Sequence, residues 1–447
     1  MTSVRWKDLT DEIKRYKIAL SPHKKLPADV WLHIFFQLCC LPTGFDGSSE
    51  TSLSPSEILS QVCSGWQQLL MSSPAIWSSI QCLEWRPYSL SHAARLLSRA
   101  GNIPRSLRIT RAYNRSIQTP FRYEGRPPYR LGMAEELVSL YPFRSLDIQF
   151  PIQFSKIPIE SLLPLEELIL CPGGQECKRT SLSPHSLPNL KCLIISGYVP
   201  MPSFHQPRPF STWPNLRKLA LHCWLPKFEC LTILRDTIRI EECTMRVDSD
   251  GETRSIVEDI VLPRLMTLVL DFRPGRDLAS FLDTLTLPNL TSLELHDGGC
   301  DEQTLHQLAK RSGMRDMKEL TICEAETPLD VGVLLEIFPS LCHLEIYARI
   351  RLDKSTMHRI WSGELGPRLR TLHLQGSRGY QTTEFRQFTI RRQQLNQPKP
   401  ISLLEKVSVE AYPHPLGKSQ LSHDGIEFEV GIVHNIELPT CEAAITP

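Results

Sequence analysis

The sequence predicts an α/β fold, in which a short helical module near the N-terminus precedes an irregular solenoid with a parallel sheet on its concave side. Two observations support this. The template P-x-L-x-x-L-x-L recurs along most of the chain, at intervals of about 22 to 28 residues. Before the template begins, two stretches, residues 30–41 and 58–70, carry apolar side chains at helical spacing.

The composition is typical of a folded soluble protein. Of the 447 residues, 41% are hydrophobic and 22% are charged, and the net charge of +1 gives no global attraction to nucleic acid or to an anionic membrane. No signal peptide is visible, and the most apolar run, residues 30–41, is too short to span a bilayer. The 14 cysteines include no C-x-x-C pair. We therefore expect an intracellular protein, cytoplasmic or nuclear, with no metal, no cofactor and no membrane contact.

The first 22 residues are expected to form an amphipathic helix. Apolar side chains stand three or four positions apart from Trp6 to Leu20, which marks one stripe of about two heptads. A helix this short favours packing against the next module over forming an independent coiled coil.

The next module, residues 23–80, is predicted to be a helical hairpin with an inserted surface loop at 43–53. Its first helix is expected to begin at Pro27. Proline suits a helix start because it lacks the backbone N–H that would have no partner there. Its second helix begins with a capping-box pattern, Ser54 and Glu57 around Pro55, and continues through a broad apolar face. Trp66 on this face could fill either the core or an interface, whereas Trp77, after the break at Pro74, is expected in the core.

Copies of the strand template span residues 100–411, and a tail of residues 412–447 follows. The weaker copies include a degenerate one that the long gap after Leu216 predicts near residues 233–247. The clear copies begin at residues 187, 213, 262, 287, 338 and 366, and the weaker ones lie at 104–109, 143–148, 165–170, 317–322 and 404–409.

Each copy predicts a short strand whose leucines face inward while alternate residues face outward. Intervening segments such as 301–313 and 328–338 have helical spacing and are expected to cover the opposite side. The outward residues would form a polar concave face. The side chains expected to contact a ligand there are Lys218, His222, Asp271, Glu294, His296, Glu319, His343, Glu345, Tyr347 and His373. A solvated sheet face without a ligand is the simpler interpretation.

Two resemblances follow from these motifs. Leu26-Pro27 before a helix, followed by Val62-Cys63-x-x-Trp66, resembles the F-box, and the exit through Trp77 resembles the large fungal (basidiomycete-type) F-box families. Residues 104–411 resemble leucine-rich repeats. The asparagine or cysteine usual after the last strand leucine is absent, so the repeats are expected to be irregular.

The resemblance implies a substrate-recognition subunit of an SCF-type (cullin-RING) E3 ubiquitin ligase. The F-box would dock on a Skp-type adaptor of the cullin ligase core, and the repeats would hold an unknown protein substrate. Catalysis would then be proximity alone, and the chain itself would not be an enzyme. The residues that the resemblance assigns to adaptor binding are Leu26, Pro27, Val30, Ile34, Phe35, Val62, Cys63 and Trp66.

Two alternatives remain open at this stage. The chain could be a repeat scaffold without ligase function. It could also bind nucleic acid through the arginine-rich and aromatic segment 104–130, although an ordinary surface loop explains that segment more simply. The sequence contains no P-loop, G-x-G-x-x-G, G-x-S-x-G or H-E-x-x-H motif that would indicate an enzyme.

Overall fold

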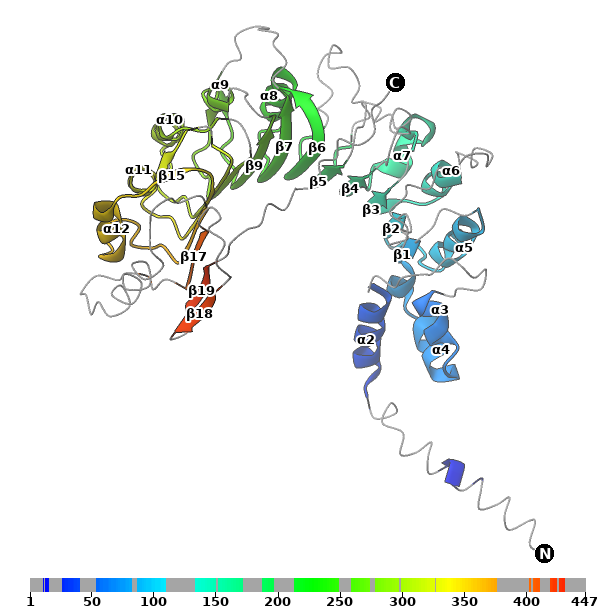
Figure 1. Ribbon diagram of the computed structural model, residues 1–447. Coiled ribbons are helices and arrows are strands. Elements are labelled where there is room, and N and C mark those ends of the chain that lie inside the picture. The colour runs from blue at the N-terminus through cyan, green and yellow to red at the C-terminus, as the bar shows by residue number, and fades with distance from the viewer. Residues whose placement is uncertain are drawn as a thin grey trace, which may run out of the picture. The chain divides into compact units, whose positions relative to one another are not determined.

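A computed structural model gives the fold of the chain (Figure 1). The chain divides into two compact units, residues 1–187 and 188–447, and each unit carries a parallel sheet. The fold is thus α/β with parallel sheets, as the sequence predicts. The residues that the structure describes are 11, 13–15, 26–40, 54–82, 87–109, 133–149, 152–171, 187–196, 213–248, 259–273, 278–296, 299–325, 327–375, 402, 405–410, 419–423 and 426–430.

The first unit begins with helices and continues as alternating strands and helices. Strands β1, β2, β3 and β4 pair in parallel and in chain order, and α5, α6 and α7 lie on one side of them (Figure 1). The elements are α2 (Ala28–Cys40), α3 (Pro55–Ser60), α4 (Ser64–Met71), the 3-10 turn η2 (Pro74–Trp77), β1 (Ser79–Cys82), α5 (Pro87–Ser98), β2 (Arg105–Ile109), α6 (Met133–Leu140), β3 (Phe143–Ile148), η3 (Phe154–Lys156), α7 (Ile159–Leu162) and β4 (Glu167–Leu170).

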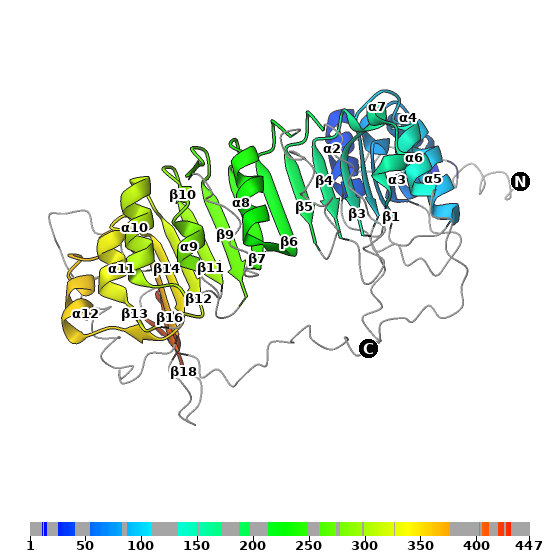
Figure 2. The same ribbon diagram turned by 90° about the horizontal axis from the view of Figure 1, so that it is seen from above.

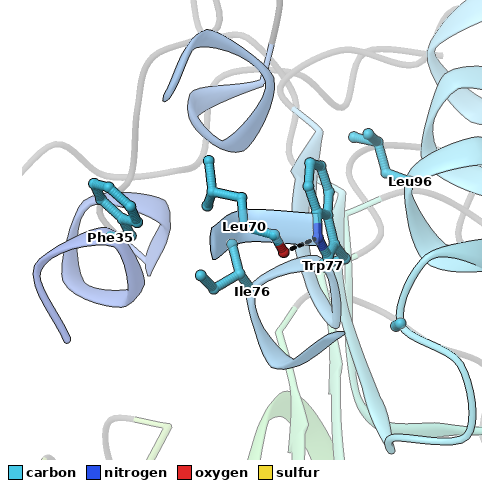
Figure 3. Packing of buried hydrophobic residues seen from close by; sticks show 6 residues of the cluster. Phe35, Leu70, Ile76, Trp77 and Leu96 are labelled. Atoms are coloured by element: carbon cyan, nitrogen blue, oxygen red, sulfur yellow. Dashed lines mark hydrogen bonds between the residues drawn. The ribbon is translucent and has the colours of Figure 1, made fainter. Parts of the chain in front are cut away.

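The helical hairpin and the first strand–helix pair share one hydrophobic core (Figure 3). Phe35 from α2 and Leu70 from α4 meet Trp77 from η2 and Leu96 from α5, and all four side chains are at most 3% exposed. The prediction that Trp77 belongs to the core is confirmed. The hairpin and α5, which lie before and after β1 in the chain, therefore share one core within the first unit.

The second predicted helix of the hairpin is two helices in the structure. Its start is as expected: Ser54 and Glu57 form a capping box with Pro55 at the first helical position. The helix then ends at Ser60, and α4 starts at Ser64 with Cys63 as its N-cap residue. One continuous helix would have placed Ile58 and Val62 on the same apolar face as Trp66. Because the helix is interrupted, both residues are instead more than half exposed.

The second unit continues the alternation, with longer helices in the connections. The elements are β5 (Cys192–Ile195), β6 (Lys218–Pro226), α8 (Lys227–Asp236), β7 (Glu242–Asp248), β8 (Ile260–Val261), β9 (Thr267–Phe272), α9 (Leu278–Leu282), β10 (Leu285–Thr286), β11 (Ser292–His296), α10 (Glu302–Ser312), β12 (Glu319–Cys323), β13 (Leu329–Asp330), α11 (Val331–Ile337), β14 (His343–Tyr347), β15 (Ile350–Arg351), α12 (Lys354–Trp361), β16 (Thr371–Gln375), β17 (Lys406–Glu410), β18 (Ser419–His423) and β19 (Ile426–Val430).

The strands of its main sheet stand in the order β5-β6-β7-β9-β11-β12-β14-β16-β17-β19-β18, and every pair that the structure describes is parallel except β18 with β19. The predicted degenerate copy is real, because β7 fills the gap between β6 and β9. In β9, β11, β12, β14 and β16 the leucine and isoleucine positions are buried and alternate with partly or fully exposed ones.

Helices α8, α9, α10, α11 and α12 lie along one face of this sheet (Figures 1 and 2). Leu305 and Leu308 of α10 are buried against it, as the spacing predicted. In α11 the buried residues include Leu334 and Leu335, whereas Val333 is 39% exposed. No described helix lies on the opposite face, which we call the helix-free face.

The strands extend beyond the range expected for the solenoid. The first one, β1, begins at Ser79 within the expected hairpin module, and β18 and β19 fall in the expected tail. Three other expectations concern segments that lie outside the described residues, wholly or in large part. They are the N-terminal helix, of which only residues 11 and 13–15 are described as helical, the inserted loop 43–53 and most of the arginine-rich segment 104–130.

Candidate functional site

An exposed apolar stripe runs along α2. Leu26, Val30 and Leu38 are each about 40% exposed, and Ile34 between them is partly buried. Val30, Ile34 and Leu38 are four apart, so they share one side of α2, next to the side that packs on the core, and Leu26 lies two residues before the helix begins. A helix with both an apolar packed side and an apolar open side is unusual in a soluble protein, where the open side is normally polar. Pro27, which directly precedes α2, is exposed beside this stripe.

Phe35, expected at the adaptor surface, is in the core instead. Its side chain is 0% exposed and contacts Trp66 with ring centroids 4.8 Å apart. Trp31 completes the cluster, with its ring centroid 4.9 Å from that of Trp66. Helical spacing alone placed Phe35 on a broad apolar face and could not tell its packed side from its open side. Trp66 is partly buried against the same core, so both roles considered for it remain open.

The Val-Cys-x-x-Trp spacing has a local structural explanation. Cys63 is the N-cap residue of α4, and its Sγ accepts a hydrogen bond from the backbone N–H of Trp66, at 3.5 Å. The cap directs Trp66 back onto α2 and leaves Val62, 57% exposed, in the turn between α3 and α4. Sequence reasoning placed Val62 and Cys63 within one helix and missed this cap, because cysteine is not among the preferred N-cap residues.

Glu57 connects the hairpin to α5. Its Oε2 accepts hydrogen bonds from the backbone N–H of Ser54 at 3.0 Å and from His92 Nε2 at 2.7 Å, and its Oε1 accepts one from Arg95 at 3.1 Å. Burial desolvates the carboxylate and raises its pKa, but the bonds from Ser54 and the charge of His92 outweigh that effect, so the pKa lies below its usual value. The ionised group thus holds α3 against α5 within the first unit.

The helix-free face of the second unit carries the predicted ligand residues. Strand register places Glu294, Thr321, Glu345 and His373 side by side in one row, and Ser292, Glu319, His343 and Thr371 in the neighbouring row. All of them are partly or fully exposed, while the alternate residues of the same strands are buried. The structure therefore brings Glu294, His296, Glu319, His343, Glu345, Tyr347 and His373 together on four adjacent strands.

Each carboxylate of this group has a neutral or histidine partner. Oε1 of Glu294 lies 2.6 Å from His296 Nε2, Ser292 Oγ donates to Glu319 at 3.0 Å, and Tyr347 Oη donates to Glu345 at 3.1 Å. The Tyr347 ring also lies 4.6 Å from the imidazole of His373, centroid to centroid, and Tyr347 is 37% exposed. Thr371 Oγ1 is 2.6 Å from His343 Nδ1.

The remaining predicted residues belong to an adjoining neighbourhood, at β6, β7 and β9, in which Asp271 stands beside His296 in the strand register. Lys218 pairs with Glu242 at 2.6 Å, and Asp271 pairs with Arg246 at 2.9 Å. The pKa of His222 is lowered, first by desolvation and then by the charge of Arg246. The predicted set is therefore spread over two adjoining parts of one sheet face.

Sequence reasoning missed the centre of this second neighbourhood. The guanidinium groups of Arg246 and Arg273 lie 5.5 and 5.4 Å from the centroid of the Trp224 ring. Arg246 lies in the degenerate copy near residues 233–247, whose residues do not match the strand template, so its outward direction could not be predicted. Trp224 follows an irregularity in the pairing of β6 with β7, which breaks the simple alternation.

Comparisons with protein-family models and with curated proteins find no match for this chain. In the described ranges, no helix is both long and apolar enough to cross a membrane. Histidine, cysteine, aspartate and glutamate side chains in the same ranges form no group of three or more that could hold a metal ion.

Proposed function

We propose that this protein is the substrate-recognition subunit of an SCF-type ubiquitin ligase. The α2–α4 hairpin docks on a Skp-type adaptor, and the repeats of the second unit bind a protein substrate. The observation that carries the proposal is the apolar stripe of Leu26, Val30 and Leu38, each about 40% exposed, with the partly buried Ile34 between them, in a segment whose motifs resemble the F-box. No residue of this chain is assigned a catalytic role, because holding a substrate near a charged conjugating enzyme is sufficient.

The exposed apolar area supports docking on another protein. Besides the stripe, Ile58 and Val62 at the α3–α4 turn are 54% and 57% exposed. Covering an apolar side chain of this size stabilises a complex by about 1.5–3 kcal/mol when burial is complete. A helix that presents residues i, i+4 and i+8 to a groove is a common mode of protein recognition.

The shared core gives the proposed docking helix a firm support within the first unit. Because Phe35, Trp77 and Leu96 pack in one cluster, a partner held by α2 is fixed relative to β1 and α5. Glu57 adds a polar link between α3 and α5.

The test is co-purification of the full chain with a Skp-type adaptor. We expect stable binding that Ile34→Asp and Val30→Asp abolish, and that Leu26→Ala combined with Pro27→Ala weakens. Phe36→Asp is the matched control, because Phe36 is 42% exposed on α2 but lies away from the stripe. Each variant is first checked for an unchanged melting temperature. A folded wild-type chain that does not bind the adaptor would refute the proposal.

A further inference from the structure

The helix-free face between β11 and β16 has an unusual charge distribution. Position by position, these strands present Ser292, Glu294 and His296, then Glu319, Thr321 and Cys323, then His343, Glu345 and Tyr347, then Thr371, His373 and Gln375. None of these residues is lysine or arginine. In the described part of the chain, the hydrogen bonds of Glu294, Glu319 and Glu345 come from histidine, serine and tyrosine, and no lysine or arginine forms an ion pair with them.

The spacing of the three carboxylates makes their fields add. Glu294 and Glu345 occupy the same row with one strand between them, and Glu319 lies in the next row on that middle strand. Adjacent strands are about 4.8 Å apart, so the outer two are separated by about 10 Å at the backbone. This is close to the Debye length of about 8 Å at physiological salt, so a cation placed above the middle strand is attracted by all three.

An aromatic pair stands beside the carboxylates. The ring of Tyr347 packs against that of His373 at an interplanar angle of 39°, and its hydroxyl donates to Glu345, so the ring is held in place while 37% of the residue stays exposed. Tyrosine combines a large contact area with few rotatable bonds, and it is enriched among the residues that dominate interfaces. The patch therefore joins an ordered aromatic anchor to an uncompensated negative charge.

We propose that this face binds a segment of the protein substrate that carries lysine or arginine side chains. The cations lie over Glu294, Glu319 and Glu345, and an apolar part of the segment packs on Tyr347 and His373. The inference rests on the proposed function, since it describes the substrate that the receptor holds. Charge complementarity selects this occupant, because an acidic segment or a nucleic acid backbone would be repelled by the same three groups.

The contrast with β6, β7 and β9 strengthens the assignment. On those strands Lys218 is paired with Glu242, and Arg246 with Asp271, so the charges of the same face are compensated there. The uncompensated region thus begins at β11. A bound segment is expected to lie across β11, β12, β14 and β16 and to end before Lys406 of β17, which is the next cation along the row.

The experiment measures the binding of fluorescein-labelled peptides to the full chain by fluorescence anisotropy. One probe alternates lysine with glycine and serine, and the other has glutamate in place of every lysine. We expect binding of the lysine probe only, with an affinity that falls as salt is raised. The triple variant Glu294→Gln, Glu319→Gln and Glu345→Gln should weaken this binding about tenfold or more, since each exposed ion pair contributes modestly.

The matched control is a triple variant with the same change in net charge away from this face. Glu336, Glu364 and Glu405 are exposed and pair with Arg359 or Arg370, so their change to glutamine removes the same number of negative charges. We expect the control to bind the lysine probe within about twofold of wild type. Equal weakening in both triple variants, or no binding of the lysine probe by wild type, overturns the inference.

The same variants separate this inference from the proposed function. Both triple variants retain the α2 stripe, so their binding to the Skp-type adaptor should equal that of wild type. Adaptor binding without peptide binding would overturn the substrate assignment alone. Peptide binding without adaptor binding would refute the ligase proposal. The chain would then be a repeat protein that binds lysine- or arginine-containing segments outside a ubiquitin ligase.

Discussion

The indole N–H of Trp77 donates a 2.9 Å hydrogen bond to the carbonyl oxygen of Leu70, at the last turn of α4 (Figure 3). Trp77 is 1% exposed, and the guanidinium of Arg99 lies 4.7 Å from its ring centroid. One side chain therefore joins α4, η2 and the end of α5. This contact explains why a large aromatic residue follows the Pro74 break.

Replacing Trp77 tests this role. We expect Trp77→Ala to lower the free energy of unfolding by about 3–5 kcal/mol, since it empties a large buried volume. Trp77→Phe should cost less, because it keeps an aromatic ring and the Leu70 carbonyl also accepts from the backbone N–H of Ser73. Urea unfolding of the full chain measures both values. A cost below 1 kcal/mol for Trp77→Ala would contradict the core assignment.

Glu57 predicts a specific dependence of stability on pH. Its pKa in the folded chain lies below the usual value, so its stabilisation is present above a pH of about 4.5 and is lost as the pH falls through the folded pKa. We expect Glu57→Gln to lower the free energy of unfolding by about 1–2 kcal/mol at neutral pH. The difference from wild type should shrink below pH 4.5.

Melting temperatures of both proteins between pH 7 and pH 3 measure this dependence. A difference that stays constant over the whole range would show that the charge of Glu57 is not what holds α3 against α5. Glu166→Gln is a suitable control, because Glu166 pairs with Arg144 on the surface of the same unit.

Glu229 in the first turn of α8 predicts the opposite dependence. Burial raises the pKa of this carboxyl to about 7, so the folded chain keeps it protonated over a range in which the unfolded chain ionises it. Stability from this group is therefore lost as the pH rises from about 4.5 through 7. We expect Glu229→Gln to raise the free energy of unfolding by about 1–3 kcal/mol at pH 8 and to change it little at pH 4. Urea unfolding of both proteins at the two pH values measures these differences. An equal effect of the substitution at both values would contradict a raised pKa for Glu229.

Most of the strands could be predicted from the sequence. The template fixes both the strand and its inward side, so Leu293 and Leu295 were expected inside and Glu294 outside, and the structure agrees. The hairpin was harder, because α2 is apolar on two sides and helical spacing cannot tell which side packs. That choice depends on Trp31 and Trp66, whose contact joins residues far apart in the sequence.

The Trp224 neighbourhood could not be predicted for a related reason. It depends on Arg246, whose strand lacks the template, and on an irregular register between β6 and β7. Similarly, the bonds from His92 and Arg95 to Glu57 link α5 to α3 across more than 30 positions of sequence. Spacing rules describe neighbours within one element, and these contacts join different elements.

Two adjacent residues of α2 give the sharpest test of the hairpin. Phe35 is 0% exposed among aromatic neighbours, whereas Ile34 lies on the open stripe. We expect Phe35→Ala to lower the free energy of unfolding by about 3–5 kcal/mol. Ile34→Ala should lower it by less than about 1 kcal/mol while weakening adaptor binding at least tenfold, since its side chain completes the docking stripe. Unfolding titrations and adaptor affinities of the two variants measure these effects separately. If Ile34→Ala instead destabilised the chain as much as Phe35→Ala, the stripe would belong to the core and α2 would have no open apolar side to offer a partner.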